Sequence, residues 1–323
     1  MSSSNKLPWR GFLLASVAAL LFGISAPLAK LWFSEISPLA AAGLIYTSAG
    51  LILLMLLLIR RLVWQRWTAV REAPFCRSDL PYLAGSVFFG GMLGTTFLLY
   101  GLNHASGMAA SLLLNLEMVF TVLIALCFGE SLTRQSTFGM LAILGGSLLL
   151  AVAPEQAGGT TIIGMLAIVA SCFSWGMDNN LTQKIAAKDP LILMFVKAAV
   201  AGLINLLLAC GTGAAWPSFS ETGAAILVGG VCYNLSLICF ILALRELGTA
   251  RTGSLFATAP FVGVITSTFI LQEEITWLIL VAGGAMASGV GMMVAEDHNH
   301  EHVHQPLWHA HRHVHDEHHE HEH

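Results

Sequence analysis

Charged residues are scarce in this chain, and their scarcity excludes a soluble protein. Only 11% of the 323 residues are Asp, Glu, Lys or Arg, whereas soluble domains carry about a quarter. Hydrophobic residues make up 56%, and the mean hydropathy is +0.73. A chain of this composition cannot bury its apolar surface in water. The sequence also lacks a basic patch, so we expect no nucleic-acid partner.

Several chemical motifs are missing as well. The apolar segments contain no HExxH or aspartate-rich diphosphate motif, and the chain has no GxxxxGK[ST] loop for nucleotide phosphates. The six cysteines lie singly, with no CxxC pair, as buried structural thiols do. We therefore expect no enzymatic activity, no required cofactor and no ATP hydrolysis.

Long apolar runs are what the sequence has instead. Runs of about 20 apolar residues cross the hydrocarbon layer as helices, and the alternation of a β-barrel is absent. The first run follows Lys6 and Arg10 without a small-residue cleavage site, so we interpret it as an uncleaved span. The pattern predicts an all-α integral membrane protein with ten transmembrane helices. Their expected ranges are 9–30, 38–60, 80–102, 105–128, 136–153, 161–184, 190–211, 221–244, 249–271 and 275–295.

Basic residues are distributed unequally between the two sides of such a chain. If the N-terminus is cytoplasmic, the outer loops hold only Lys30. This bias predicts a multi-pass protein of the cytoplasmic (inner) membrane with both termini in the cytoplasm. The inner side holds Lys6, Arg10, Arg60, Arg61, Arg66, Arg71, Arg77, Arg134, Lys184, Lys188, Arg245, Arg251 and Arg312.

The chain also resembles itself. Residues 101–112 match 244–255 at an offset of 143, and Gly11, Phe22 and Gly23 match Gly164, Trp175 and Gly176 at an offset of 153. We interpret residues 1–155 and 156–297 as two five-helix repeats, followed by a disordered tail at 298–323. Because five is odd, the repeats have opposite orientations in the membrane, which is an architecture of secondary transporters.

Short motifs add a family resemblance over residues 9–295. They are Leu-Phe-Gly at 21–23, Leu-Asn-Leu-Glu-Met-Val-Phe at 114–120, Phe-Gly-Glu-Ser-Leu-Thr at 128–133 and Ala-Leu-Arg-Glu-Leu-Gly-Thr-Ala at 243–250. The chain resembles the ten-helix EamA-type branch of the drug/metabolite transporter superfamily. The resemblance implies transport of a small solute and a homodimer supported by the last helix of each repeat. Met118 stands where the family commonly has proline, which argues against a kink in the fourth helix.

The chief ionisable residues inside the predicted spans are Asp178, Lys197 and Glu117. A charge within a span costs at least ~2.5 kcal/mol. Asp178 and Lys197 lie at similar depths on neighbouring helices and could form an ion pair. Such a pair could fix helix packing, or it could be broken by substrate or protons. Glu117 lies close to the midplane, where it could carry a proton or hydrogen-bond helix ends.

Amide and aromatic side chains complete the candidate pathway. Each could instead serve packing, as an interhelical hydrogen bond or a lipid-interface anchor. The full set of candidate substrate and proton residues is Glu117, Asn115, Asp178, Asn179, Asn180, Lys197, Trp175 and Asn234.

The last 26 residues differ sharply from the rest, since residues 298–323 hold 12 of the 13 histidines. Imidazoles at alternate positions on a flexible chain can bind Zn²⁺, Ni²⁺, Co²⁺ or Cu²⁺. The candidate ligands are His300, His302, His304, His309, His311, His313, His315, His318, His319, His321 and His323.

These observations favour a secondary transporter that exports a small metabolite or drug-like solute in exchange for protons. The alternative is an exporter of divalent transition metals, or a carrier regulated by them. Expected partners are the lipid bilayer, the solute, protons, divalent metal ions bound by the tail and a second copy of the chain.

Overall fold

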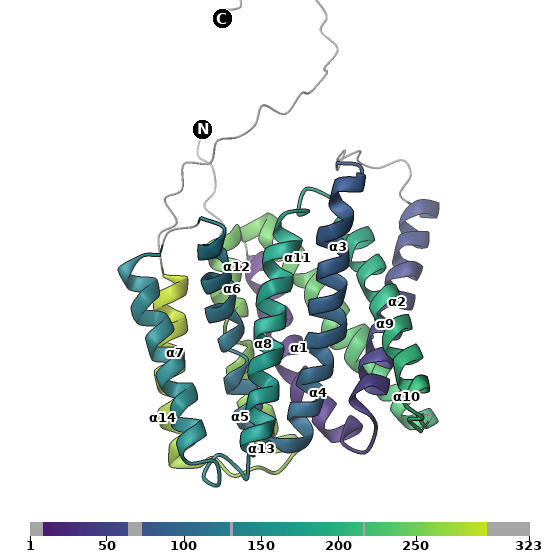
Figure 1. Cartoon of the computed structure of the whole chain (residues 1–323). Helices are drawn as coiled ribbons and strands as arrows, with labels where there is room; N and C mark the ends of the chain where they lie inside the picture. Colours follow the sequence, from purple (N-terminus) through teal and green to yellow (C-terminus); the bar gives the residue numbers. More distant parts are fainter. Residues whose placement is uncertain (1–8, 64–72, 130–131, 216, 296–323) are drawn as a thin grey trace, which may run out of the picture.

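The computed structural model describes residues 9–63, 73–129, 132–215 and 217–295, and within them it contains helices and no strand. Ten helical segments are long and apolar enough to cross a membrane, as the sequence predicts. Figure 1 shows them side by side in one bundle. The elements are α1 (Trp9–Phe33), α2 (Pro38–Val63), η1 (Arg77–Asp79), α3 (Leu80–Ser86), η2 (Val87–Gly94), α4 (Thr95–His104), α5 (Gly107–Leu113), α6 (Leu116–Cys127), α7 (Arg134–Val152), α8 (Ile162–Gln183), α9 (Pro190–Gly211), α10 (Phe219–Ala225), η3 (Ile226–Leu235), α11 (Ser236–Leu247), α12 (Thr249–Phe256), α13 (Ala259–Ile270) and α14 (Trp277–Val294).

The bundle has two ends, which we name by what they carry. The terminal face, uppermost in Figure 1, holds the start of α1 and the end of α14. The pocket face, at the bottom, holds the ends of α1, α4 and α13 and the connection between α7 and α8. Because α1 begins at the terminal face and α8 begins at the pocket face, the two halves run in opposite directions.

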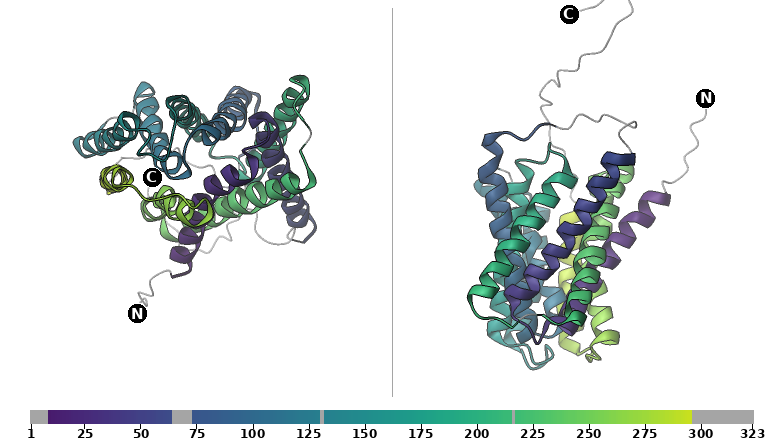
Figure 2. Two further views of the ribbon diagram at one scale, coloured as in Figure 1. Left: turned by 90° about the horizontal axis from the view of Figure 1, so that it is seen from below. Right: turned by 90° about the vertical axis from the view of Figure 1, so that its right-hand side faces the viewer.

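Packing between the halves is reciprocal. Helix α1 of the first half lies against α11 and α13 of the second, while α8 of the second half lies against α4 and α6 of the first. Figure 2 shows the two sets of helices interleaved around one centre. Each half therefore buries its first helix in the other half, so neither half has a complete core by itself.

Glycines at the crossing of α2 and α9 show the same reciprocity at atomic detail. A Cβ on Gly202 would lie 2.6 Å from the backbone nitrogen of Thr47, and one on Gly50 would lie 3.2 Å from the backbone nitrogen of Ala199. Thr47 and Ala199 are 152 positions apart, as are Gly50 and Gly202. The two contacts are what a pseudo-twofold axis through this crossing produces.

Helices α7 and α14 form a second crossing of this kind. A Cβ on Gly146 would lie 2.9 Å from the carbonyl oxygen of Ala282, and one on Gly289 would overlap the carbonyl of Gly139. Gly139, Gly146 and Gly289 therefore pack these two helices, the last of each repeat, against one another within one chain. Gly145, Gly284 and Gly291 have no atoms near the position of a Cβ, and the homodimer stays a prediction.

Gly145 and Gly146 provide a matched pair of substitutions. We expect Gly146→Val to lower stability by about 1–3 kcal/mol, because the new side chain must displace α14. Gly145→Val places the same side chain one position away in open space, so it should have a much smaller effect. Thermal unfolding of both variants in one detergent measures the difference. Equal losses would mean that valine acts through helix propensity and not through the contact with α14.

The third helix of each half contains a π-helical segment. Segments η2 and η3 each hold a pair of adjacent glycines, Gly90–Gly91 and Gly229–Gly230, and all four are buried. A π-helix widens the backbone and is found most often at functional sites. In η2 the carbonyls of this wide turn accept hydrogen bonds from other helices, as described below.

The fourth span is divided into two helices although it lacks the family's proline, and the expectation that it is not kinked stays a prediction. Helix α5 ends at Leu113 and α6 begins at Leu116, with the Glu117 N–H bonded to the carbonyl of Leu114 three residues before it. Asn115 causes the tighter turn, because its side-chain amide donates to the Leu112 carbonyl at 2.8 Å. The Leu113 carbonyl then accepts from the Cys172 thiol of α8.

Charged side chains join the connections at the terminal face. Asp189 caps the first turn of α9 through the N–H groups of Leu191 and Ile192, and it forms an ion pair with Arg60 of α2. Partial burial acts to raise the pKa of Asp189, but the hydrogen bond and charge of Arg60, with the two N–H groups, hold that pKa below its usual range. The pair therefore stays charged at neutral pH.

Candidate functional site

Asp178 and Lys197 form an ion pair between α8 and α9, which confirms that these residues meet. Both side chains are largely buried, with 10% of Asp178 and 15% of Lys197 exposed. Asp178 also accepts hydrogen bonds from Ser86 of α3 and, at 3.0 Å, from Thr182 one turn further along α8. Its carboxylate is thus surrounded by donors and neutralised by a cation, which is how a buried charge is stabilised.

Segment η2 lies directly against this ion pair. A Cβ on Gly90 would overlap the carboxylate of Asp178, so only glycine fits there. The Gly90 carbonyl accepts hydrogen bonds from the indole nitrogen of Trp175 at 3.1 Å and from the Tyr46 hydroxyl at 3.3 Å. The π-helical turn is therefore held from both α8 and α2. The candidate residues Trp175, Asp178 and Lys197 all gather around it.

Asn205 extends the same face of α9 two turns beyond Lys197. It is fully buried and donates to the Gly91 carbonyl of η2 at 3.0 Å. Its side-chain oxygen has no hydrogen-bond partner among the residues that the structure describes. The contact ties η2 to α9, so a movement of η2 would strain both the amide and the ion pair.

Glu117 lies on the opposite side of α8, in the first turn of α6. Its carboxylate accepts a hydrogen bond from the Asn179 amide at 2.9 Å. The Asn179 amide also lies 3.1 Å from the Thr121 hydroxyl. Glu117 is half-buried, Asn179 is exposed, and no described cation comes within salt-bridge distance of Glu117. Its environment therefore differs from that of Asp178, although both lie in apolar spans.

The other candidate amides donate hydrogen bonds to backbone carbonyls. Asn180 donates to the carbonyls of Thr121 and Gly176 and so joins α8 to α6. Asn234 of η3 donates to the Ala49 carbonyl of α2 at 2.8 Å. Asn115 donates to Leu112 at the interruption between α5 and α6. All three side chains are buried in these contacts.

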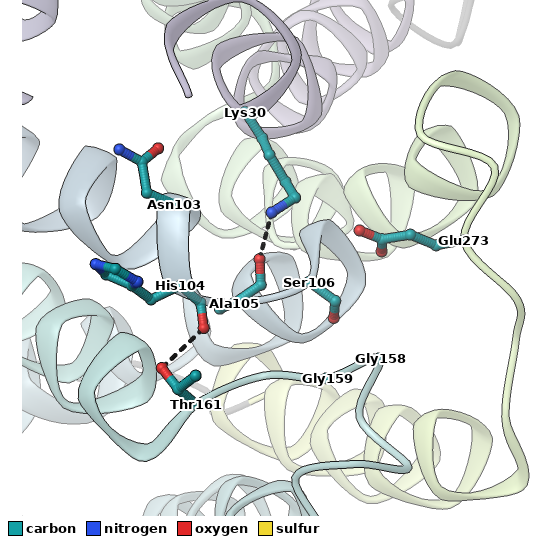
Figure 3. Close-up of a pocket in the computed structure, with 9 residues that line it drawn as sticks. All are labelled: Lys30, Asn103, His104, Ala105, Ser106, Gly158, Gly159, Thr161 and Glu273. Atoms are coloured by element: carbon teal, nitrogen blue, oxygen red, sulfur yellow. Dashed lines mark hydrogen bonds between the residues drawn. The ribbon is translucent and has the colours of Figure 1, made fainter. Parts of the chain in front are cut away.

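A pocket of about 250 Å³ opens at the pocket face. Figure 3 shows Lys30 of α1 and Glu273, between α13 and α14, extending toward one another beside the break between α4 and α5. From the sequence, we place Lys30 in an outer loop and do not single out Glu273. The lining residues are Lys30, Asn103, His104, Ala105, Ser106, Gly158, Gly159, Thr161 and Glu273.

The candidate metal ligands, His300 to His323, lie outside the described residues. Within the described part of the chain, no group of three or more His, Cys, Asp or Glu side chains could hold a metal ion. Metal binding by the tail stays a prediction.

The fold and its buried charges define a class of protein before any comparison is made. Ten apolar helices in two oppositely directed halves, with ionisable side chains between them, are the architecture of a membrane transporter. The chain belongs to the EamA-like transporter family, whose family model matches residues 9–152 and 162–295. These two matches cover the segments that the sequence comparison identifies as repeats.

Individual proteins agree with this assignment. An uncharacterized transporter of Methanothermobacter thermautotrophicus is 27% identical over 300 residues, covering 87% of this chain and 84% of the relative. A "probable terminal-alkyne amino-acid exporter" of Streptantibioticus cattleyicolor is 26% identical over 221 residues, covering 67% and 73%. A solved crystal structure matches with a TM-score of 0.61 at 19% identity over 87% of this chain and 95% of that one, which shows the same fold.

Proposed function

We propose that this transporter exports a small metabolite or drug-like solute in exchange for protons, with Glu117 as the proton-binding group. One observation carries the proposal. Glu117 is a half-buried carboxylate with an amide partner and no described cation within salt-bridge distance, whereas Asp178 is neutralised by Lys197. A lone carboxylate in an apolar span is costly while charged, so it has a reason to bind a proton that Asp178 does not share.

Asn179 supports the role of Glu117. Its amide can accompany the carboxylate through protonation, because it can donate a hydrogen bond in one state and accept one in the other. Asp178 and Lys197 then have a structural role in joining α8, α9 and η2.

Proton coupling can be tested before the substrate is identified. Purified protein is reconstituted in liposomes that contain a pH-sensitive dye, and single amino acids, Zn²⁺, Ni²⁺ and Co²⁺ are added in turn. Amino acids are the first probes because the Streptantibioticus relative bears the name of an amino-acid exporter. We expect at least one organic solute to move protons across the membrane. Solute flux that ignores the pH gradient would contradict the coupling.

The histidine-rich tail favours metal regulation as a second function. We expect deletion of residues 298–323 to leave solute transport intact but to remove its response to micromolar Zn²⁺ or Ni²⁺, because the tail holds 12 of the 13 histidines. Transport rates of the full and truncated chains in proteoliposomes, with and without metal, make the comparison. Identical metal responses in the two chains would eliminate the tail as a sensor.

A further inference from the structure

The break between α4 and α5 leaves backbone groups without helical partners. Helix α4 ends at His104, Ala105 and Ser106 are extended, and α5 begins at Gly107. Carbonyls at the end of α4 and N–H groups at the start of α5 therefore need other partners. These groups lie at the pocket face, beside the lining residues of the pocket.

Two oppositely charged side chains supply those partners. The Lys30 ammonium donates to the carbonyls of Leu102 and Ala105, at 2.8 and 2.6 Å. The Glu273 carboxylate accepts from the N–H groups of Gly107 and Met108, at 2.6 and 2.9 Å. The cation stands at the end of one helix and the anion at the start of the next, which is the favourable arrangement for both helix dipoles.

The two side chains come from different halves of the protein. Lys30 belongs to α1 of the first half, and Glu273 follows α13 of the second. The backbone there is also tightly packed, since a Cβ on Gly107 would lie 2.5 Å from Leu271 and 2.6 Å from Ser267 of α13. Ser106 is held in addition by the Ala157 carbonyl at 2.8 Å. The break is thus fastened where the two halves meet.

Glu246 at the end of α11 forms an ion pair with Arg10 of α1, at 3.4 Å, beside the corresponding break at the terminal face. Among the described residues this break has no equivalent of the Lys30 and Glu273 contacts. It lies between α11 and α12, where a Cβ added to Gly248 would have no atoms within 4 Å. Ala105, the aligned residue, is only 4% exposed. Glu130, the residue aligned with Glu273, lies outside the described residues. The described contacts therefore fasten the break at the pocket face to both halves, whereas at the terminal face they join the end of α11 to the start of α1.

We propose that Lys30 and Glu273 form a clamp that closes the solute pathway at the pocket face by fastening the α4–α5 break to both halves. Four hydrogen bonds to charged groups hold the closed state. Their loss frees Gly107 to move away from Ser267 and opens the pathway on that side. The clamp controls whether the solute pathway is open to the solution at the pocket face. The proposal therefore goes beyond the proton-coupled export proposed above and does not depend on Glu117.

Accessibility of position 267 tests the clamp, because the Ser267 side chain is fully buried against Gly107 in the closed state. Ser267→Cys is introduced into a chain whose exposed Cys76, Cys127 and Cys210 are replaced by serine. The protein is placed in lipid nanodiscs and labelled with a polar maleimide. The same background with Ser267 unchanged gives the labelling of the remaining buried cysteines.

We expect Glu273→Ala to raise the labelling rate of the introduced thiol by about tenfold or more, since each lost bond to a charged group shifts the opening equilibrium several-fold. Glu274→Ala is the matched control, because Glu274 is the exposed neighbour and is not a pocket residue. Lys30→Met is an independent variant that releases the other side of the break. It should also raise the labelling rate of the introduced thiol. If Glu273→Ala does not fold, the labelling rate of the Lys30 variant tests the clamp instead.

The outcomes separate a clamp from a static helix cap. A static cap predicts that Glu273→Ala lowers the unfolding temperature while the introduced thiol is labelled as slowly as before, and that result overturns the proposal. Faster labelling in the Glu273 or Lys30 variant, with the Glu274 variant unchanged, supports it. The measurement needs neither a transported solute nor a proton gradient, so it stands or fails separately from the function proposed for Glu117.

Discussion

Replacing Glu117 by glutamine is expected to abolish proton-driven accumulation of solute while leaving the protein folded. Glutamine keeps the size of the side chain and can still accept a hydrogen bond from Asn179, but it cannot bind and release a proton. A pH difference of about one unit supplies about 1.4 kcal/mol per proton, which corresponds to about tenfold accumulation. The variant should lose this accumulation entirely and retain exchange of labelled for unlabelled solute. Uptake into proteoliposomes with and without a pH gradient measures both.

Glu155 offers a control for this experiment. It is an exposed carboxylate in the connection between α7 and α8, and Glu155→Gln removes the same charge away from the candidate site. The control variant should keep full accumulation. Accumulation by the Glu117 variant that matches the unmodified protein would show that the proton is carried elsewhere or that no proton is coupled.

Breaking the ion pair between Asp178 and Lys197 should have the largest effect on stability. We expect Lys197→Met or Asp178→Asn alone to cost about 3–5 kcal/mol when the substitution leaves a buried charge without its partner. Lys197→Met should be the more harmful, because Asp178 then remains charged beside Gly90. The double variant should recover much of the loss, since no buried charge is left. The free energy of unfolding in detergent, measured for the unmodified protein, the two single variants and the double variant, gives a double-mutant cycle for this pair.

The same cycle decides between the two roles that the sequence leaves open for this pair. A structural pair gives variants that lose stability, with transport restored alongside stability in the double variant. If Asp178→Asn is as stable as the unmodified protein but does not transport, the pair instead opens during the cycle. In that case its assignment as a packing element is wrong.

The sequence was sufficient for the spans because hydrophobic length is a local property. Helix α9, for example, occupies Pro190–Gly211, the range that its apolar residues indicate. The repeat was inferred from residues that recur at offsets of 143 and 153. The partners of individual side chains were harder to infer. Asp178 and Lys197 could be paired because they lie at the same depth in the membrane on consecutive helices. Few pairs of residues in the chain have such a relationship.

The clamp residues show why the rest could not be inferred. Lys30 and Glu273 are more than two hundred positions apart, and each binds backbone groups of a third segment that carry no signal in the sequence. The interruption after Leu113 was missed for a related reason. At this position the Asn115 amide donates to the Leu112 carbonyl of the same span, and a search for proline does not detect such a bond.

The π-helical segments have a consequence for how α3 and α4 are connected. A π-turn takes up one more residue than an α-turn, so removing one residue from the segment Val87–Gly94 would let it close into a regular α-turn. Helix α4 would then keep its rotational phase relative to α3, and Leu98 and Leu102 would stay in the core. What would change is the widened turn itself, whose Gly90 carbonyl accepts hydrogen bonds from Trp175 and Tyr46. The extra residue therefore serves the contacts of η2 with its neighbours and leaves the direction of the α4 side chains unchanged.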